Sequence, residues 1–401
     1  MDVAAVRALQ GPEGARLLGS LPPYDESEAL ATGTRLRREG VGEALVAAAL
    51  TQARLRARAV PKFGREAARM LFTPDGLEQA TRPGVARRHA RRFAAAGARS
   101  VADLCCGIGG DLRALGEAVD RVLGADRDPV TVEVARANVT VWGLAGRVDV
   151  RCGDVLEVDL AGWEGVFVDP ARRRAGGGRT FDPRAYSPPY DEVLRIVSGV
   201  PAAGIKLAPG IPHRVLPAGA EAEWVSDGGD VVECALWLGS LAGGVARRAT
   251  LLPSGASLTG SGDVRADVGP VARYLYEPDG AVIRAGLVAE AAAQVDGHLV
   301  DPTIAYVTSD VLTRTPFLTA YEVTDVLPFG VKRLRSLLRS RGVGRVVVKK
   351  RGSAVTPEEL RRQLRLSGPE EATIVLTRVA GAATVLLVEQ VSPRHGRPRA
   401  P

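Results

Sequence analysis

The feature that most constrains the fold of this chain is a glycine-rich turn that follows a short apolar segment. The apolar run begins near Ser100 and ends in Cys105-Cys106-Gly107-Ile108-Gly109-Gly110-Asp111, and a helical pattern begins at Leu112. Gly107 and Gly109 have no Cβ, so the backbone can turn sharply and let a ligand come close. A strand, a tight turn and a helix in this order predict a ligand site at the carboxyl end of the strand. Taken alone, the turn is equally consistent with a simple connection.

Three further apolar segments, each ending in an acid, follow the turn. They are 121–126, which ends in Asp126, 148–154, which ends in Gly153-Asp154, and 165–170, which ends in Asp169-Pro170. Asp126 lies about twenty residues past the glycine turn, the spacing at which a carboxylate binds ribose hydroxyls in nucleotide-binding βαβ units. Because helical patterns separate the segments, the sequence predicts an α/β fold with a parallel, doubly wound sheet.

The order of these motifs resembles that of class I S-adenosylmethionine-dependent methyltransferases. The pattern D-x-x-C-G-x-G-G occupies 103–110, and Asp126, Gly153-Asp154 and Asp169-Pro170 follow it. The Cys-Gly-x-Gly-Gly form is closest to the RNA guanine-N2, trimethylguanosine synthase-like branch, and the resemblance covers roughly residues 70–240. A NAD-binding unit is disfavoured, because Leu112 stands where G-x-G-x-x-G requires its third glycine.

The resemblance implies S-adenosylmethionine as the cofactor and assigns the motif residues to parts of it. The residues expected at the cofactor are Asp103, Cys105, Gly107, Gly109, Asp126 and Asp154. Asp103 would bind the amino end, directly or through water, Asp126 the ribose diol and Asp154 the adenine amine. An interpretation of these acids as helix caps or surface charges is weaker, because they stand at successive strand ends. By the same resemblance, Glu78, Gln79 and Thr81 would line the pocket or its approach.

Asp169 and Pro170 are expected to be the catalytic element, which would promote direct in-line methyl transfer by positioning and electrostatics. Amino-methyltransferases of this kind usually have Asp/Asn/Ser-Pro-Pro-aromatic here, whereas this chain has Ala171-Arg172 after Asp169-Pro170. The departure puts exocyclic-amine chemistry in doubt. Arg172 and Arg173 would suit a substrate phosphate.

A second segment, Ser187-Pro188-Pro189-Tyr190, matches the aromatic form of the motif by its letters. No apolar strand precedes it, so Ser187 is interpreted as a helix N-cap and Pro188 as the first helical residue. The target base would then stack on Arg172 or on an aromatic from elsewhere, such as Phe181, Tyr186 or Tyr190.

Two polar side chains stand apart from the motifs. His89, in a basic helix that runs from Gly84 to Ala96, is interpreted as a surface or packing histidine rather than a catalyst. Lys206 lies in an apolar segment that precedes Pro209. It either pairs with Asp169 or extends its ammonium to the rim of the sheet.

Composition adds limits to the class of protein. The chain has 401 residues, which is long for one domain, and it has no apolar run that could cross a bilayer and no basic-apolar signal peptide. We therefore expect a cytoplasmic protein. Its four cysteines lack C-x-x-C spacing and are expected to be reduced, and no metal is expected. A cysteine nucleophile for 5-methylpyrimidine chemistry is disfavoured, because no cysteine directly follows Asp169-Pro170.

Charge is distributed unevenly along the chain. Lys and Arg against Asp and Glu number 17 to 10 in residues 1–100, 20 to 31 in residues 101–330 and 16 to 5 in residues 331–401. An acidic middle between basic ends predicts a catalytic core flanked by surfaces that bind a polyanion. A GC-rich coding bias would explain why the chain uses Arg rather than Lys. It would not explain why acidic residues exceed basic ones in residues 101–330.

The C-terminal part resembles a THUMP-like domain, and true THUMP domains bind structured RNA, notably tRNA. From about residue 316 the pattern is strand, helix, strand, helix and two strands. The cations expected to contact RNA are Lys332, Arg333, Arg335, Lys349 and Lys350. The alternative is an accessory α/β domain that only braces the fold.

The expected organisation is an N-terminal helical region (1–96), a Rossmann-like methyltransferase domain (97–260), a connecting region (261–326), a small α/β THUMP-like domain (327–392) and a disordered tail (393–401). The expected function is S-adenosylmethionine-dependent methylation of a nucleotide in structured RNA, either tRNA or rRNA. The alternatives are a small-molecule methyltransferase and a non-catalytic RNA-binding protein with the same fold.

Overall fold

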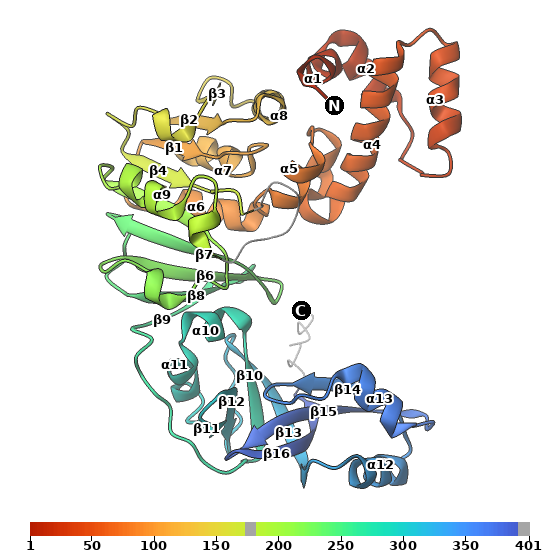
Figure 1. Cartoon of the computed structure of the whole chain (residues 1–401), viewed down its shortest axis with the longest axis vertical. Helices are drawn as coiled ribbons and strands as arrows, with labels where there is room; N and C mark the ends of the chain where they lie inside the picture. The colour runs from red at the N-terminus through yellow and green to blue at the C-terminus, as the bar shows by residue number, and fades with distance from the viewer. Residues whose placement is uncertain (173–181, 392–401) are drawn as a thin grey trace, which may run out of the picture. The chain divides into compact units, whose positions relative to one another are not determined.

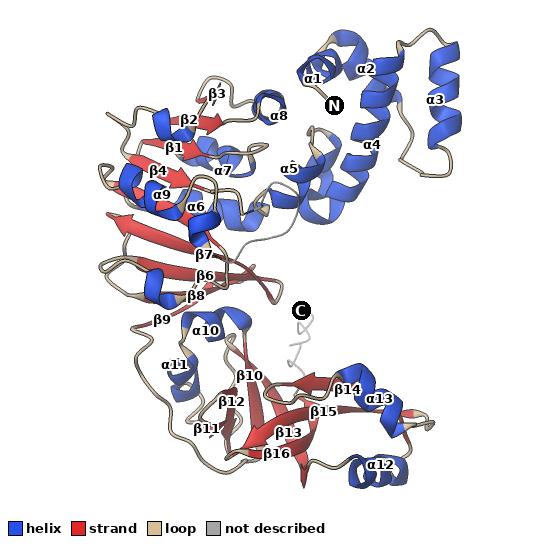
Figure 2. Ribbon diagram, in the orientation of Figure 1, coloured by secondary structure: helices blue, strands red, loops and turns tan. Residues whose placement is uncertain are grey.

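The computed structural model describes residues 1–172 and 182–391 (Figures 1 and 2). Arg173, Phe181 and the expected tail 393–401 lie outside the described residues. The chain forms two compact units, one of Met1–Ala222 with Glu233–Gly244 and the other of Glu223–Val232 with Val245–Pro401. This division into two units does not test the boundaries of the five segments expected from the sequence. Those boundaries stay predictions.

The first unit begins with helices, as the N-terminal pattern predicts. They are α1 (Val3–Gln10), α2 (Pro12–Ser20), α3 (Ala29–Arg38), α4 (Glu43–Phe63), the 3-10 turn η1 (Gly64–Ala68), α5 (Pro74–Gln79) and α6 (Pro83–Ala95). Thr73 caps α5 by accepting from the amide of Gly76, and Pro74 occupies the first helical position. A Cβ at Gly76 would collide with Ile108, so this glycine lets α5 pack directly on the glycine turn.

A parallel sheet follows the helices. Its parallel strands are β1 (Ser100–Leu104), β2 (Arg121–Asp126), β3 (Val148–Cys152), β4 (Gly165–Val168) and β5 (Ala202–Leu207), and β7 (Asp230–Gly239) is antiparallel to β5. In this unit the strand order is β3-β2-β1-β4-β5-β7. The predicted doubly wound sheet is therefore confirmed. Between β1 and β4 the order reverses direction, which is where such sheets bind ligands.

Helices and short turns connect these strands. They are α7 (Gly110–Ala118), α8 (Pro129–Val141), η2 (Val155–Glu157), η3 (Pro183–Ala185), α9 (Tyr190–Val197) and η4 (His213–Val215). The strand β6 (Glu221–Asp227) follows η4 in the chain. The expectation that Ser187 caps a helix is wrong, because α9 begins at Tyr190 with Pro189 at the N-cap. Ser187 instead pairs with Ala171 through two backbone hydrogen bonds of 2.9 and 3.0 Å.

The second unit contains β8 (Arg247–Leu252) and β9 (Ala256–Gly260), which pair with each other, and a seven-stranded sheet. Its elements are β10 (Tyr274–Pro278), α10 (Gly280–Ala285), α11 (Val288–Ala293), β11 (His298–Asp301), β12 (Ile304–Ser309), β13 (Leu318–Pro328), α12 (Val331–Ser340), β14 (Val343–Lys350), α13 (Pro357–Leu364), β15 (Glu370–Val379) and β16 (Ala382–Gln390). The predicted C-terminal order of strands and helices is confirmed.

The seven strands follow the order β11-β12-β10-β13-β16-β15-β14. Strands β10, β11 and β12 come from the region expected only to connect two domains, and β10 pairs antiparallel with β13. Lys349 on β14 nevertheless reaches Glu277 on β10, at 2.6 Å, across three intervening strands. The sheet must therefore curve strongly, since strand twist accumulates over many strands.

Two features are absent from the described residues. No helix within them is long and apolar enough to cross a membrane. In the same part of the chain, no three His, Cys, Asp or Glu side chains are grouped so that they could hold a metal ion.

Candidate active site

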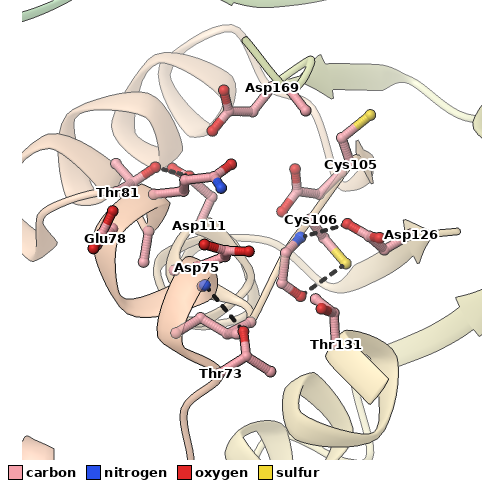
Figure 3. A pocket seen from close by; sticks show the side chains of 18 of the residues that line it. Thr73, Asp75, Glu78, Thr81, Cys105, Cys106, Asp111, Asp126, Thr131 and Asp169 are labelled. Atoms are coloured by element: carbon pink, nitrogen blue, oxygen red, sulfur yellow. Dashed lines mark hydrogen bonds between the residues drawn. The ribbon is translucent and has the colours of Figure 1, made fainter. Parts of the chain in front are cut away.

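A cavity of about 240 Å³ opens at the carboxyl ends of β1, β2 and β4 (Figure 3). Its walls are the segment 73–81, which contains α5, the glycine turn 105–111, and residues that follow β2 and β4. This is the edge where the strand order reverses and where open parallel sheets bind ligands. The pocket therefore lies where the glycine turn predicted it.

The glycine turn takes its shape from three left-handed residues and from the neighbouring strand. Cys105, Gly107 and Gly109 have φ angles of 62°, 55° and 91°, and Gly109 is the N-cap of α7. The amide of Gly107 donates to Oδ2 of Asp126 (3.1 Å), and the amide of Asp128 donates to Oδ1 of Asp126 (3.0 Å). Because backbone amides orient both of its oxygens, the Asp126 carboxylate is a fixed acceptor at the pocket wall.

Asp103, near the end of β1, lines the pocket and is 1% exposed. Among the residues that the structure describes, its Oδ2 atom has no hydrogen-bond partner. Burial raises the pKa of Asp103 well above its usual range, and the nearby Asp111 and Asp169 raise it further. A buried carboxyl oxygen without a partner fits a ligand that brings its own donor or positive charge.

Asp154 lies beside the main pocket. It is the N-cap of η2, where Oδ1 accepts from the amide of Leu156 at 2.9 Å. With Leu156 and Pro188 it lines an adjoining hollow of about 190 Å³, which shares Cys105 and Asp126 with the main pocket. Asp154 thus borders the same ligand region without lining its main cavity.

The structure brings most of the expected site residues together. Those that line the main pocket are Asp103, Cys105, Gly107, Asp126, Asp169, Pro170 and Arg172, with Glu78, Gln79 and Thr81 from the α5 side. Gly109 faces away from it and packs on Trp142, whose ring a Cβ would approach to 3.4 Å. Arg173 lies outside the described residues.

A lysine from the neighbouring strand holds the Asp169 carboxylate. Nζ of Lys206 donates to Oδ2 of Asp169 at 2.7 Å and to Oγ1 of Thr81 at 2.9 Å. Lys206 is 5% exposed, so the pairing with Asp169 is confirmed and the extension to the rim is wrong. Burial alone would lower the pKa of Lys206, but Asp169, Glu233 and Asp111 outweigh burial and raise it.

His89 is fully buried beneath the pocket and packs on Phe167, so of the two interpretations the packing histidine is confirmed and the surface histidine is wrong. Its Nδ1 lies 2.8 Å from Oδ1 of Asp111, and its Nε2 lies 2.6 Å from Oε1 of Glu233. The hydroxyl of Thr81 donates to Oδ2 of the same Asp111 at 2.5 Å (Figure 3). Burial alone would lower the pKa of His89, but the two carboxylates raise it to about 10. Both ring nitrogens are therefore protonated at neutral pH and donate.

Side-chain amides fix the chain that leads into α5. The Asn138 amide accepts from the amide of Leu71 (2.8 Å) and donates to the carbonyls of Leu71 and Ile108 (both 3.0 Å). The Gln52 amide bonds Phe72 in the same two-way manner, at 2.9 and 2.7 Å. Both amides are buried, and each imitates the pairing of a strand. They hold the α5 wall in place relative to the glycine turn.

Gln52 and Asn138 were not expected at the site, and His89 was noted without a role in it, although for Gln52 and His89 the sequence carried a signal of burial. Gln52 stands three residues before Leu55, and His89 lies four residues from both Val85 and Phe93. A polar residue on an apolar helical face is buried and needs partners. The partners themselves come from distant segments and could not be inferred from that pattern.

Two of the aromatics proposed to stack on a base, Tyr186 and Tyr190, are buried and hydrogen-bonded within the protein, and the third, Phe181, lies outside the described residues. Tyr186 and Tyr190 are each 3% exposed. The Tyr190 hydroxyl donates to the carbonyl of Val215 at 3.2 Å, and the amide of Ala208 donates to the Tyr186 hydroxyl at 3.3 Å. Neither ring is presented to a substrate in this arrangement.

The cations expected to contact RNA in the second unit differ in their surroundings. Lys332 and Arg333 are exposed on α12. The other three are hydrogen-bonded within the unit, Arg335 to the carbonyl of Gln363, Lys349 to the carboxylate of Glu277 and Lys350 to the carbonyl of Val355. Of these three, Lys350 is also exposed, whereas Arg335 and Lys349 are half-buried.

Comparison with protein families gives three matches. The RNA cap guanine-N2 methyltransferase model matches residues 98–190, and the THUMP domain-like model matches residues 318–390. A domain family of unknown function matches residues 2–59. The first match includes the glycine turn, Asp126 and Asp169-Pro170, which are the motifs that line the pocket.

The chain is also similar to known proteins over most of its length. It is 37% identical over 338 residues to an uncharacterized S-adenosylmethionine-dependent methyltransferase of Mycobacterium tuberculosis, found in strains CDC 1551 and H37Rv, and the match covers 82% of this chain and 92% of the relative. A crystal structure of a proposed methyltransferase from Porphyromonas gingivalis W83 matches with a TM-score of 0.74 and 20% identity, over 93% of this chain and 100% of that one. The crystal structure supports the fold alone.

Proposed function

The chain belongs to the S-adenosylmethionine-dependent methyltransferases, and from this premise we propose that it methylates a nucleotide of structured RNA, either tRNA or rRNA. The observation that carries the proposal is the position and the positive charge of Arg172. Arg172 lines the pocket at the position where amine methyltransferases have an aromatic, and the other charged side chains that line it within residues 1–172 and 182–391 are carboxylates. A cation placed there fits a substrate with an anionic backbone.

S-adenosylmethionine, when bound, supplies a methyl group activated by a sulfonium centre. The residues present fit it. Asp103, with its unpartnered Oδ2, suits the ammonium of the methionine part, and the fixed carboxylate of Asp126 suits the ribose hydroxyls. Asp154, in the adjoining hollow, suits the adenine amine. The acidic lining as a whole attracts a positively charged ligand.

Arg172 supports an anionic substrate on chemical grounds. Within the described part of the chain, its guanidinium has no hydrogen-bond or ion-pair partner. A guanidinium presents a rigid set of donors that matches a phosphate in a bidentate manner. Arg172 is therefore suited to bind a phosphate next to the target nucleotide.

The approach to the pocket from α4 is also basic. Nζ of Lys62 donates to the carbonyls of Leu77 and Glu78 at the end of α5, at 2.9 and 3.2 Å. Arg58 lies 4.0 Å from the Glu78 carboxylate, and Arg54 is exposed one turn earlier. Contacts to phosphate supply most of the affinity of RNA-binding proteins, so cations beside the α5 wall favour a long polyanion over a small substrate.

Asp169 is proposed to orient the target atom. Lys206 bonds only Oδ2 of Asp169, so Oδ1 can accept a hydrogen bond from the target N–H or O–H. The Asp169 side chain is 24% exposed, which allows access from the pocket. Pro170, which also lines the pocket, offers its backbone carbonyl as a second acceptor. Positioning of this kind can lower the barrier by several kcal/mol.

The proposal is tested by supplying labelled S-adenosylmethionine and total RNA from a strain that lacks this protein, with small-molecule and protein fractions in parallel. We expect label in one size class of RNA, released by nuclease. Label confined to small molecules would instead establish a small-molecule methyltransferase. Cofactor binding with no transfer to any fraction would favour a non-catalytic RNA-binding protein.

A cytoplasmic location belongs to the same proposal. All four cysteines are free thiols, although Cys105 and Cys106 are adjacent in the chain. Reduced thiols are typical of a reducing compartment, where tRNA and rRNA are also modified.

A further inference from the structure

A row of buried polar side chains runs beneath the pocket and ends at Asp169. In order, its members are Glu233 on β7, His89 on α6, Asp111 on α7, Thr81 before α6, Lys206 on β5 and Asp169 after β4. Neighbouring members are 2.5–2.9 Å apart, and the four ionic members that precede Asp169 are at most 5% exposed. The proposed function uses only Asp169, so the rest of the row has no assigned role.

A gain in stability is a weak explanation for this row, even though removing one member alone would be costly. Taking charges out of water costs several kcal/mol per ion, and apolar replacements of buried ion pairs are often neutral or stabilising. The surroundings are apolar, since the His89 ring lies 4.6 Å from the Phe167 ring and 5.8 Å from the Trp237 ring, between centroids. A low-polarity environment also strengthens each hydrogen bond in the row. Rigid ionic contacts that end at the reactive carboxylate point to a role in the reaction.

The row contains two permanent cations at neutral pH. The pKa of His89 is raised to about 10, and that of Lys206 is raised above its usual value by Asp169, Glu233 and Asp111 against the effect of burial. The charges therefore alternate from Glu233 to Asp169. A protonated lysine or histidine cannot take a proton from substrate, so neither residue is a general base.

We propose that Lys206, anchored through Thr81 and Asp111 to His89 and Glu233, is the positioning residue of methyl transfer. Its ammonium holds the Asp169 carboxylate in one orientation and in its ionised form, which leaves Oδ1 to accept the donor group of the target nucleotide. This inference rests on the proposed function, because it assumes that Asp169 faces the target atom. His89 sets where Lys206 lies, since its two ring nitrogens tie α6 to α7 and β7.

The expected pH dependence follows from the charges around the pair. Besides Lys206, the described groups that face Asp169 and its partners are Asp103 on β1, Cys105 in the glycine turn, Asp111 on α7, Glu233 on β7, Arg172 after β4 and Lys62 on α4. All of these remain when Lys206 is replaced. Removing the adjacent cation raises the pKa of the Asp169 carboxylate, so that activity, which requires the ionised form, is lost at a higher pH than in the native protein.

The test is Lys206→Met in the full chain, measured as single-turnover methyl transfer to RNA between pH 5 and 9. We expect the rate at neutral pH to fall about 100-fold, as a small displacement of a positioned group can cause. The acid limb of the profile should move up by about one to three pH units. The dissociation constant of S-adenosylmethionine should change less than threefold, and Lys206→Arg should recover part of the rate.

A matched control removes a largely buried, paired cation from the same unit. Arg92 lies on α6, the helix that carries His89. It pairs with Glu221 at 2.8 Å and donates to the carbonyl of Leu241 at 2.8 Å. Arg92→Met should lower stability without moving the acid limb. If Lys206→Met does not fold, Thr81→Val keeps the Lys206–Asp169 pair but cuts the row, and a rate reduced about tenfold is expected. A folded Lys206→Met protein with an unmoved acid limb and a near-native rate would overturn the inference.

A readout without substrate separates this inference from the proposed function. Aspartate carboxyl carbons labelled with 13C, with Asp169→Asn to assign the signal, report the pKa of Asp169 in the native and Lys206→Met proteins. A raised pKa in the variant, together with an absence of transfer to RNA by the native protein, would contradict only the proposed substrate. An unchanged pKa would contradict the inference even if RNA is methylated.

Discussion

Two lysine–carboxylate pairs, one in each compact unit, have nearly the same geometry in opposite surroundings. Lys206 lies 2.7 Å from Asp169, and Lys349 lies 2.6 Å from Glu277. The first lysine side chain is 6% exposed, whereas the second is 30% exposed and rests 5.3 Å above the ring of Tyr321. The distance between the charges therefore does not distinguish the two pairs.

The surroundings determine what each pair does. The Lys349 pair joins β14 to β10 across a curved sheet and shares its carboxylate with Arg351 at 3.5 Å. The Lys206 pair borders the pocket and continues through Thr81 to a buried histidine. A partly exposed pair such as Lys349–Glu277 links two strands and contributes little stability. A buried pair that opens on a cavity belongs to the chemistry of that cavity.

The largest effect that would sharpen this comparison is expected from Asp169→Ala. The variant removes the acceptor for the target atom, and methyl transfer to RNA should fall about 100- to 1,000-fold, as for the loss of one preorganised polar group. The affinity for S-adenosylmethionine should change little, because Asp103 and Asp126 remain. Normal turnover by this variant would mean that the pocket carboxylate has no part in the reaction.

The second effect compares the two pairs directly through stability. Lys206→Met leaves a buried carboxylate without its cation and should lower the free energy of unfolding by about 3 kcal/mol. Lys349→Met removes a half-exposed pair and should cost about 1 kcal/mol or less. Urea denaturation of both variants measures the difference. Equal losses would break the comparison between the two units.

A third effect concerns the cofactor. Asp126→Ala removes a carboxylate that orients the amide of Gly107 and is expected to bind the ribose hydroxyls. Hydrogen bonds to a charged group are worth about 1.5–3 kcal/mol, so the dissociation constant of S-adenosylmethionine should rise about 10- to 100-fold by calorimetry. Asp149→Asn, an exposed strand residue paired with Arg151, is a matched control. Unchanged affinity for Asp126→Ala would contradict the assignment of the ribose site.

A fourth and smaller effect separates exposed from tied cations in the second unit. Replacing both Lys332 and Arg333 by Ala should reduce the slope of log affinity for RNA against log salt concentration by about 2, because each cation is expected to neutralise one phosphate. Lys349→Met should change the slope less, since Glu277 already neutralises this lysine. An equal change for both variants would show that the tie to Glu277 opens when RNA binds.

The smallest effect comes from a lysine that donates to backbone carbonyls. Burial lowers the pKa of Lys62 to about 8, and Lys206 and Arg82 add to the shift. In the unfolded chain the pKa is about 10.5, so between pH 8 and 10.5 the unfolded state binds more protons and stability rises with pH. The gain should be about 1 kcal/mol or less, because the side chain is partly exposed. Lys62→Met should abolish this rise in urea titrations across that range.

Much of the fold followed from local pattern. Apolar segments of strand length, each ending in an acid and separated by helical periodicity, were enough to predict the parallel sheet and the position of its pocket. The expected residues Asp103, Cys105, Gly107 and Asp126 line that pocket. These residues stand at the ends of different strands. They come together because the carboxyl ends of parallel strands meet at one edge of the sheet. Ser187 was misjudged because its backbone pairs with Ala171, a pairing that local propensity cannot reveal.

The sequence by itself determined the alternation of strands and helices, the glycine turn and the acids at the strand ends, because each depends on residues close together in the chain. Only the tertiary structure decided which charges meet beneath the pocket. His89 and Glu233 lie 144 positions apart, and Thr81 and Lys206 lie 125 apart. Such contacts exist only once the sheet has brought α6, β5 and β7 together, since a buried charge is tolerated only where folding supplies its partner.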